Sequence, residues 1–141
     1  MKILIPVDGS ANAQRAVEQV IKNVALMKEA PQLLLLNVQW NVATGNVKLF
    51  INQETVNDYY YDQGMAALQS ARAALDAAGL PYQYHISIGT PAGAIAQYAH
   101  EQEVDQIVMG RQGQGVMQTL LLGSVVNKVL HLVECPVLLV K

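Results

Sequence analysis

Cysteine, charged residues and long hydrophobic runs are all scarce in this sequence. Cys135 is the only cysteine, which excludes an internal disulfide and a thiolate metal cluster within the chain. No block of lysine or arginine is present, so neither nucleic acid nor an acidic membrane is an expected partner. The apolar run at residues 3–5 is too short for a signal peptide, and no run approaches the length of a membrane span. These absences predict a cytoplasmic protein.

The composition of the chain is that of a globular protein. Its 141 residues are 52% hydrophobic and 14% charged, with a formal net charge of −2. A chain of this length can bury about 70% of its unfolded surface, enough for a core without a disulfide or metal. Such a composition argues against disorder. We therefore expect a single domain over residues 1–141.

Apolar runs alternate along the chain with segments of helical periodicity. Five runs predict strands, at residues 2–7, 33–38, 82–88, 106–109 and 137–140. The spacing between them predicts four helices, the first after residue 10, the second ending near 78, the third from 91 and the fourth at 124–132. This alternation predicts an α/β fold with a parallel sheet and helices on both faces. The third run alternates apolar and polar residues, which is typical of an edge strand.

Residues at the predicted helix ends have the types that begin or terminate helices. Ser10 fits the N-cap of the first helix, and Thr90 fits that of the third, with Pro91 at the first helical position. Gly79 fits the position just after the second helix, and Pro81 prevents the helix from continuing. A longer polar connection, at about residues 39–53, separates the second strand from the second helix.

Glycines gather in the stretch GRQGQGVMQTLLLGS, residues 110–124, which directly follows the fourth strand. The spacing of Gly110 and Gly115 is that of a P-loop, but residues 116 and 117 lack the required lysine and hydroxyl group. A dinucleotide-binding pattern fails because its third glycine is replaced by Gln118 and because the stretch does not follow the first strand. Neither of these two phosphate loops is therefore present.

Glycine at the end of a strand still lets the backbone turn sharply and bring N–H groups close to a phosphate. Gly123 and Ser124 stand at a helix start, where free N–H groups and the helix dipole favour an anion. The alternative is that the glycines form a tight turn and that Ser124 only caps the helix. Taken alone, these residues support both interpretations.

The spacing Gly110-x2-Gly113-x9-Gly123-Ser124 resembles the nucleotide-binding signature of the universal stress protein family. The stretches ILIPVDGS, GTPAGAIAQYA and CPVLLVK resemble further landmarks of that family, in the same order, so the resemblance covers nearly the whole chain. It implies a five-stranded parallel sheet of order 3-2-1-4-5 in a Rossmann-like three-layer sandwich. It also implies a cytoplasmic homodimer that binds ATP.

The resemblance implies a nucleotide site at individual positions of this chain. The loop after the first strand would lie near adenine and ribose, and the end of the second strand would contact adenine through its backbone. The end of the fourth strand and the glycine stretch would surround the phosphates. The nucleotide-binding residues expected in this way are Pro6, Val7, Asp8, Val38, Met109, Gly110, Arg111, Gln112, Gly113, Gly123, Ser124 and Val125.

The chain departs from the family's pattern directly after Gly110. The family has a small hydroxyl residue there, often followed by a basic one, whereas this chain has Arg111 and Gln112. Arg111 is placed to pair with a phosphate, to crowd the loop or to point into solvent. Asp8 also has two interpretations, as a ligand for ribose or a metal-bound water, or as a cap for the following turn. The resemblance favours the ligand role.

Other chemistry-bearing residues form no catalytic or metal-binding pattern. His85, His100 and His131 are scattered without ligand spacing. Cys135 precedes Pro136 and an apolar strand, so we expect an inert, packed thiol. No general base and no cradle of basic residues for phosphoryl transfer is evident. We therefore expect no catalytic side chain and no metal site built by the protein alone.

The expected function is that of an ATP-binding stress-response protein, nucleotide-responsive and accessory or regulatory in role, with Mg²⁺ or Mn²⁺ accompanying ATP. One alternative is a slow ATP-hydrolysing or phosphoryl-transfer enzyme that uses Asp8, and another is a nucleotide-free dimeric interaction module. The strand Val137–Val140 would be a bare apolar edge in the implied sheet order, and such edges invite pairing. We therefore expect a homodimer through this strand.

Overall fold

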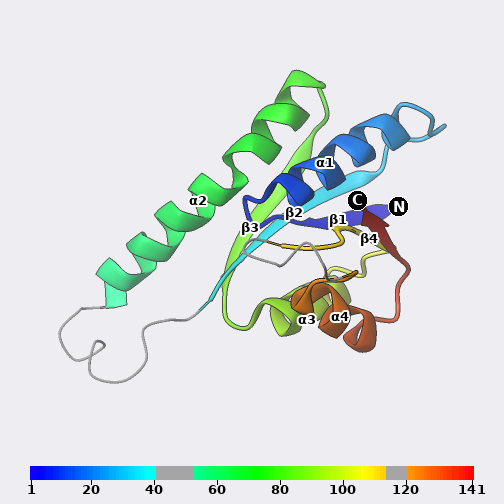
Figure 1. Ribbon diagram of the computed structural model, residues 1–141. Coiled ribbons are helices and arrows are strands. Elements are labelled where there is room, and N and C mark those ends of the chain that lie inside the picture. Colours follow the sequence, from blue (N-terminus) through cyan, green and yellow to red (C-terminus); the bar gives the residue numbers. More distant parts are fainter. Residues whose placement is uncertain (41–52, 114–120) are drawn as a thin grey trace.

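The computed structural model describes residues 1–40, 53–113 and 121–141 (Figure 1). A five-stranded sheet of parallel strands has the order β3-β2-β1-β4-β5. The strands are β1 (Lys2–Pro6), β2 (Gln32–Gln39), β3 (Tyr82–Ile88), β4 (Gln106–Gly110) and β5 (Val137–Val140). The helices of the described residues are α1 (Ala11–Val24), α2 (Gln53–Ala77), α3 (Pro91–Glu101) and α4 (Ser124–Leu132). The predicted fold class and strand order are confirmed.

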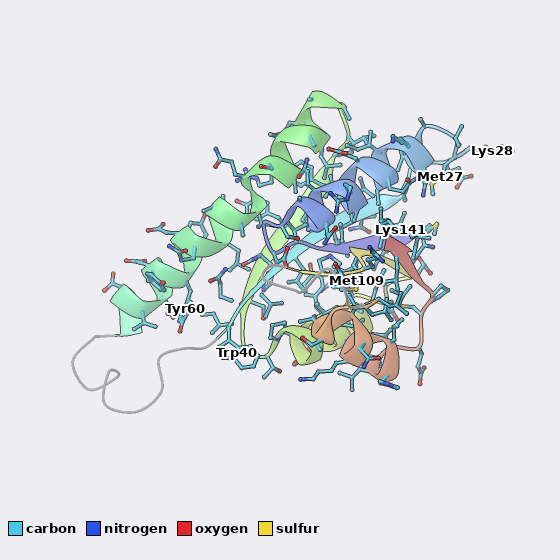
Figure 2. All side chains as sticks on the ribbon, viewed as in Figure 1. Met27, Lys28, Trp40, Tyr60, Met109 and Lys141 are labelled. Carbon is cyan, nitrogen blue, oxygen red and sulfur yellow. The ribbon has the colours of Figure 1, made fainter. Side chains whose placement is uncertain are left out.

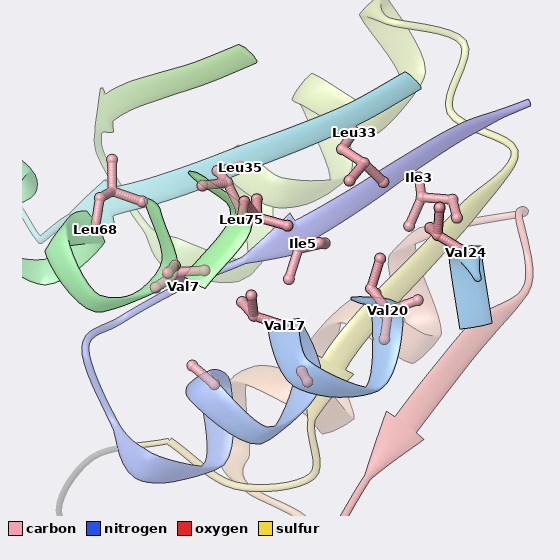
Figure 3. Close-up of a cluster of buried hydrophobic side chains, with 14 residues drawn as sticks. Ile3, Ile5, Val7, Val17, Val20, Val24, Leu33, Leu35, Leu68 and Leu75 are labelled. Carbon is pink, nitrogen blue, oxygen red and sulfur yellow. The ribbon is translucent and has the colours of Figure 1, made fainter. Parts of the chain in front are cut away.

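Helices cover both faces of the sheet, α1 and α2 on one side and α3 and α4 on the other (Figure 1). Because side chains alternate along a strand, β1 directs Ile3 and Ile5 toward α1 and α2, and Leu4 toward α3 and α4. Figure 3 shows the first of these two cores, where the strand residues meet Val17 of α1 and Leu75 of α2. Burial on both faces explains why the central strands are apolar without alternation.

The outer strands β3 and β5 are more exposed than the central three. On β3, Tyr84 is 39% exposed and Ile88 is 43% exposed, which confirms the predicted edge strand. On β5, Leu138 is 36% exposed, whereas Leu139 packs partly against the core on the side of α3 and α4. The outer edge of β5 is paired with no other strand of the described residues. This apolar edge is the feature on which the homodimer expectation depends.

Most of the predicted helix ends are confirmed. The Ser10 hydroxyl accepts a hydrogen bond from the Ala13 backbone N–H at 3.1 Å and so caps α1. Gly79 follows α2 with a φ of 68°, in the left-handed region that glycine adopts without strain. Thr90 occupies the N-cap of α3 with Pro91 next to it, but its side chain makes no capping hydrogen bond. Thr90 therefore has the predicted position without the predicted bond.

Element boundaries differ slightly from the predicted ones. β1 ends at Pro6 rather than at Val7, and β4 continues to Gly110. α1 ends at Val24, and Met27, beyond the end of the helix, packs partly against the core. The predicted connection at residues 39–53 falls mostly on 41–52, outside the described residues. None of the described helices combines the length and the apolar character needed to cross a membrane.

Candidate functional site

The loop after β1 turns sharply and leads directly into α1. Gly9 has a φ of 83°, which glycine allows without the strain that a Cβ atom would add. The Ser10 backbone N–H donates to Asp8 Oδ1 at 2.9 Å, so the Asp8 carboxylate is held at the start of α1. Asp8 is exposed, while Val7 before it is buried. The loop therefore presents a carboxylate at the carboxyl end of a buried strand.

The loop after β4 lies against both α1 and the β1 loop. A Cβ atom on Gly110 would lie 2.8 Å from backbone atoms of Asn12, which is closer than real Cβ atoms come to other groups. A Cβ atom on Gly113 would lie 2.7 Å from Asp8 Oδ2. The absence of a side chain at these two positions is therefore what allows the two loops to approach each other.

The start of α4 is hydrogen-bonded to the β4 loop. The Gly123 backbone N–H donates to the Arg111 carbonyl at 2.8 Å, and the Arg111 N–H donates to the Val140 carbonyl of β5 at 3.0 Å. Gly123 is the N-cap of α4, and no side chain caps the helix there. The first N–H groups of a helix have no partner within the helix and carry its positive dipole end. An anion beside α4 would be stabilised by both effects.

These loops enclose a pocket of about 150 Å³ at the carboxyl ends of the central strands. Its walls combine the Asp8 carboxylate with apolar side chains, including Met109 at the end of β4, which lies between the sheet and α4 (Figure 2). Of the predicted site residues, those that line the pocket are Pro6, Val7, Asp8, Val38, Met109, Gly110, Gln112, Gly113 and Val125. The structure thus brings residues from four separate parts of the chain to one place.

Three predicted site residues, Arg111, Gly123 and Ser124, do not line the pocket. Gly123 nevertheless lies close to it, because its Cβ position would be 3.2 Å from the Gln112 Cα atom. Ser124 is exposed at the first position of α4. The backbone of Arg111 joins β4 to β5 and to α4, as described above. Part of the glycine stretch, residues 114–120 with Gly115, lies outside the described residues.

Several pocket residues were not among the predicted site residues. Pro91 and Ile95 of α3 form one wall, and Leu36 and Val126 contribute apolar surface. Each was recognisable only as a core or helix residue, because nothing in a linear pattern shows that the first turn of α3 faces the end of β2. Ser10, predicted only as a helix cap, also lines the pocket.

Among the described residues, no group of three or more histidine, cysteine, aspartate or glutamate side chains could hold a metal ion. Mg²⁺ in nucleotide sites is usually held by one or two carboxylates together with phosphates and water. Asp8 is the carboxylate that the described pocket offers for such a role. The residues present fit an ion that arrives with a nucleotide.

The fold and the pocket define a class of protein. A parallel α/β sheet with helices on both faces binds ligands at the carboxyl ends of its strands, where the strand order reverses. Here the order reverses between β1 and β4, and the pocket lies at that point. The protein is therefore an open α/β protein with a pocket at its topological switch point.

The family model described as the universal stress protein family matches residues 1–141, and the chain belongs to this family. It is 30% identical over 140 residues to universal stress protein MJ0531 of Methanocaldococcus jannaschii, which covers 99% of this chain and 81% of the relative. The solved structure of hypothetical protein MJ0577 has a TM-score of 0.85 and is 28% identical, covering 99% of this chain and 94% of the other.

A more distant family member from Arabidopsis thaliana was solved with AMP bound. It is 21% identical to this chain, with a TM-score of 0.70, and covers 100% of this chain and 91% of the other. At this level of identity the similarity shows a shared fold.

Proposed function

We propose that this chain binds an adenine nucleotide, specifically ATP, in the pocket between the β1 and β4 loops. The observation that carries the proposal is the close approach of Gly113 to Asp8, beside the uncapped N-terminus of α4. This arrangement puts backbone N–H groups, a helix dipole and one carboxylate around a single apolar pocket. Structures of family members with the same fold hold AMP, dAMP or cAMP. Their ligands support the choice of an adenine nucleotide.

Each part of the nucleotide would meet a different part of the site. The base would occupy the apolar region between Val38 and Ile95, and Asp8 would accept hydrogen bonds from the ribose hydroxyls. The phosphates would lie beside Gly113 and the first turn of α4, where Ser124 can donate its hydroxyl. A bound Mg²⁺ or Mn²⁺ would neutralise phosphate charge. Arg111 does not line the pocket, and its positive charge would act on the phosphates from outside it.

The proposed role is that of a nucleotide-responsive accessory or regulatory protein in the cytoplasm. The described pocket offers groups that bind and orient a nucleotide, and the proposal assigns its one carboxylate, Asp8, to the ribose. Binding that does not stabilise a transition state more than the ground state does not accelerate a reaction. The proposal therefore assigns this pocket to sensing the nucleotide rather than to rapid turnover.

The proposed assembly is a homodimer through β5. Its exposed edge is apolar, since Leu138 is 36% exposed, and only Pro136 and Lys141 flank the strand. Pairing with a second copy across a two-fold axis would bury this edge.

Identification of the ligand that is retained on purification tests the binding proposal. Native mass spectrometry of the purified protein should show an adenine nucleotide, and calorimetric titration of nucleotide-free protein should give binding of ATP but not of GTP. Absence of retained nucleotide together with no heat of binding for ATP or AMP would contradict the proposal.

A further inference from the structure

Asn37 is a buried polar residue on the far side of the strand that borders the pocket. Among the described residues, Asn37 and Gln112 are the buried polar side chains, at 2% and 8% exposure. Gln112 lines the pocket, as do Leu36 and Val38 on either side of Asn37. Asn37 does not, because alternation along β2 directs it toward α1 and α2. A polar group buried among apolar residues is costly unless it is hydrogen-bonded, so its bonds identify its role.

Both ends of the Asn37 amide are hydrogen-bonded. Its Nδ2 donates to the Val7 carbonyl at 2.8 Å, and its Oδ1 accepts from Gln39 Nε2 at 2.7 Å. The Val7 carbonyl can only accept, so Nδ2 is the amide atom directed at it, and Oδ1 is left to accept from Gln39. Asn37 thus links the end of β2 to the first residue after β1.

This bond lies at the point where the pairing of β1 with β2 ends. The registered pairs run from Lys2↔Gln32 to Pro6↔Leu36, and the Val7 N–H still donates to the Leu36 carbonyl at 2.8 Å. A continued parallel ladder would next bring the N–H of Val38 to the Val7 carbonyl. Val7 has no registered partner on β2, and its carbonyl accepts from the Asn37 side chain.

The end of the pairing determines where the backbone of Val38 points. The Leu36 carbonyl faces β1, and the Gln39 carbonyl faces β3, where it accepts from the Gly89 N–H. Backbone groups of successive strand residues point to opposite sides, so those of Val38 face the β1 side, beyond the last registered pair. A backbone N–H and C=O at that point match the Watson–Crick edge of adenine, which presents an acceptor nitrogen and an amino donor.

We propose that Asn37 is a positioning residue for base recognition. Its side chain donates a hydrogen bond to the Val7 carbonyl, so the Val38 N–H does not pair with that carbonyl. The Val38 backbone is then available to bind the edge of adenine, while Gln39 bonds the other end of the Asn37 amide. Without this amide, the Val38 N–H would compete for the Val7 carbonyl and the strands would close over the base position. This inference rests on the proposed adenine-nucleotide site and adds Asn37 as the residue through which that site distinguishes adenine from other bases.

The test measures discrimination between two ligands that differ only at the base edge. AMP and purine riboside 5′-monophosphate, which lacks the 6-amino group, are titrated calorimetrically into the whole protein. In Asn37→Leu, affinity for AMP should fall about tenfold, the equivalent of one or two hydrogen bonds. Affinity for the analogue, which keeps the acceptor nitrogen but lacks the amino donor, should fall less because it loses one bond rather than two, so the ratio of the two affinities should fall toward one.

Two further variants distinguish an effect of Asn37 on base recognition from an effect on the stability of the fold. Leu33→Val removes buried volume from the same face of β2, away from the pocket, and should lower the melting temperature while leaving the ratio unchanged. Gln39→Ala removes the hydrogen bond to Asn37 Oδ1, which weakens the hold on the amide, and should reduce the ratio in the same direction as Asn37→Leu. It supplies the test if Asn37→Leu does not fold.

A wild-type ratio retained in Asn37→Leu, or in Gln39→Ala if only that variant folds, would overturn the role of Asn37. An equal loss of the ratio in Leu33→Val would do the same. A wild-type protein that binds neither AMP nor ATP would instead overturn the proposed function, so the two failures are distinguishable.

Discussion

A methyl group added at Gly113 should weaken nucleotide binding while leaving the fold intact. The added Cβ atom would lie 2.7 Å from Asp8 Oδ2, whereas ordinary contacts begin at 3.4 Å, so the carboxylate must move by about 0.7 Å. Asp8 is exposed and short, and it can move by giving up its hydrogen bond from the Ser10 N–H. The substitution therefore acts on a carboxylate that borders the pocket.

The cost to stability is limited to one hydrogen bond. Loss of the bond from the Ser10 N–H to the charged Asp8 carboxylate costs about 1.5–3 kcal/mol. Gly113 lies outside the left-handed region, so alanine is compatible with its backbone and stabilises by about 0.4–1 kcal/mol through the unfolded chain. The gain offsets part of the loss, and the melting temperature of Gly113→Ala should fall by no more than roughly 8 °C.

The cost to binding is larger. A displaced Asp8 loses a hydrogen bond between a charged group and the nucleotide, worth about 1.5–3 kcal/mol, so affinity for ATP should fall roughly 10- to 100-fold. The bulkier Gly113→Val should abolish measurable binding. Gly93→Ala is the matched control, since its Cβ would also approach a side-chain oxygen, Thr90 Oγ1 at 2.9 Å, but lies outside both loops.

Calorimetric titration of a double-mutant cycle tests the stated cause. If Gly113→Ala acts by moving Asp8, it should have little further effect in an Asp8→Ala background. Unchanged affinity in Gly113→Ala would refute the reasoning and make the loop only a turn. An undiminished loss in the Asp8→Ala background would refute the displacement and indicate that the methyl group meets the phosphates directly.

Three further outcomes follow from the proposals and from the burial of one thiol. Leu138→Lys should convert a dimer to a monomer in light scattering at lower cost to the core than Leu139→Lys, and a wild-type monomer at micromolar concentration would contradict the assembly. Single-turnover hydrolysis of ATP with Mg²⁺ or Mn²⁺ should be slower than about 1 per second. Fast ADP release that disappears in Asp8→Asn, with binding retained, would favour an enzyme. Burial raises the pKa of the Cys135 thiol, so less thiolate is present near neutral pH and iodoacetamide should alkylate it more slowly than free cysteine. Its rate should keep rising at pH values where free cysteine levels off, and equal rates and pH profiles would show an exposed thiol.

The strands and helices of this protein are largely predictable from its sequence. The apolar runs of the central strands follow directly from their burial on both faces, whereas β3 is exposed along much of its length, as an edge strand is. The order of the strands did not follow from alternation and came from the family resemblance. The end of β1 was placed one residue late, because Val7 is as apolar as the strand before it. At that residue the backbone carbonyl accepts from the Asn37 side chain of β2, a contact that no local pattern contains.

The residues of the candidate site are predictable where they belong to a sequence motif in a loop. The pocket residues that come from other helices and strands are not predictable in this way. The family resemblance assigns Asp8 and Gly113 to the site, since the residues alone leave a capping role and a simple turn equally open, and the structure places the two residues together. Pro91 and Ile95 were recognisable only as parts of a helix, and their approach to Leu36 depends on the packing of α3 against the sheet.

Arg111 uses both of its backbone groups to join segments that are far apart in the chain. Its N–H is bonded to the last residue of β5, and its carbonyl is bonded to Gly123 at the start of α4. Local opening of β5 would break the first bond and release the residue that holds the second. Amide hydrogen exchange at residues 111 and 123 should therefore rise and fall together, as a single opening unit. A contact that holds the outer edge of the sheet closed would then also slow exchange of the Gly123 amide at the start of α4.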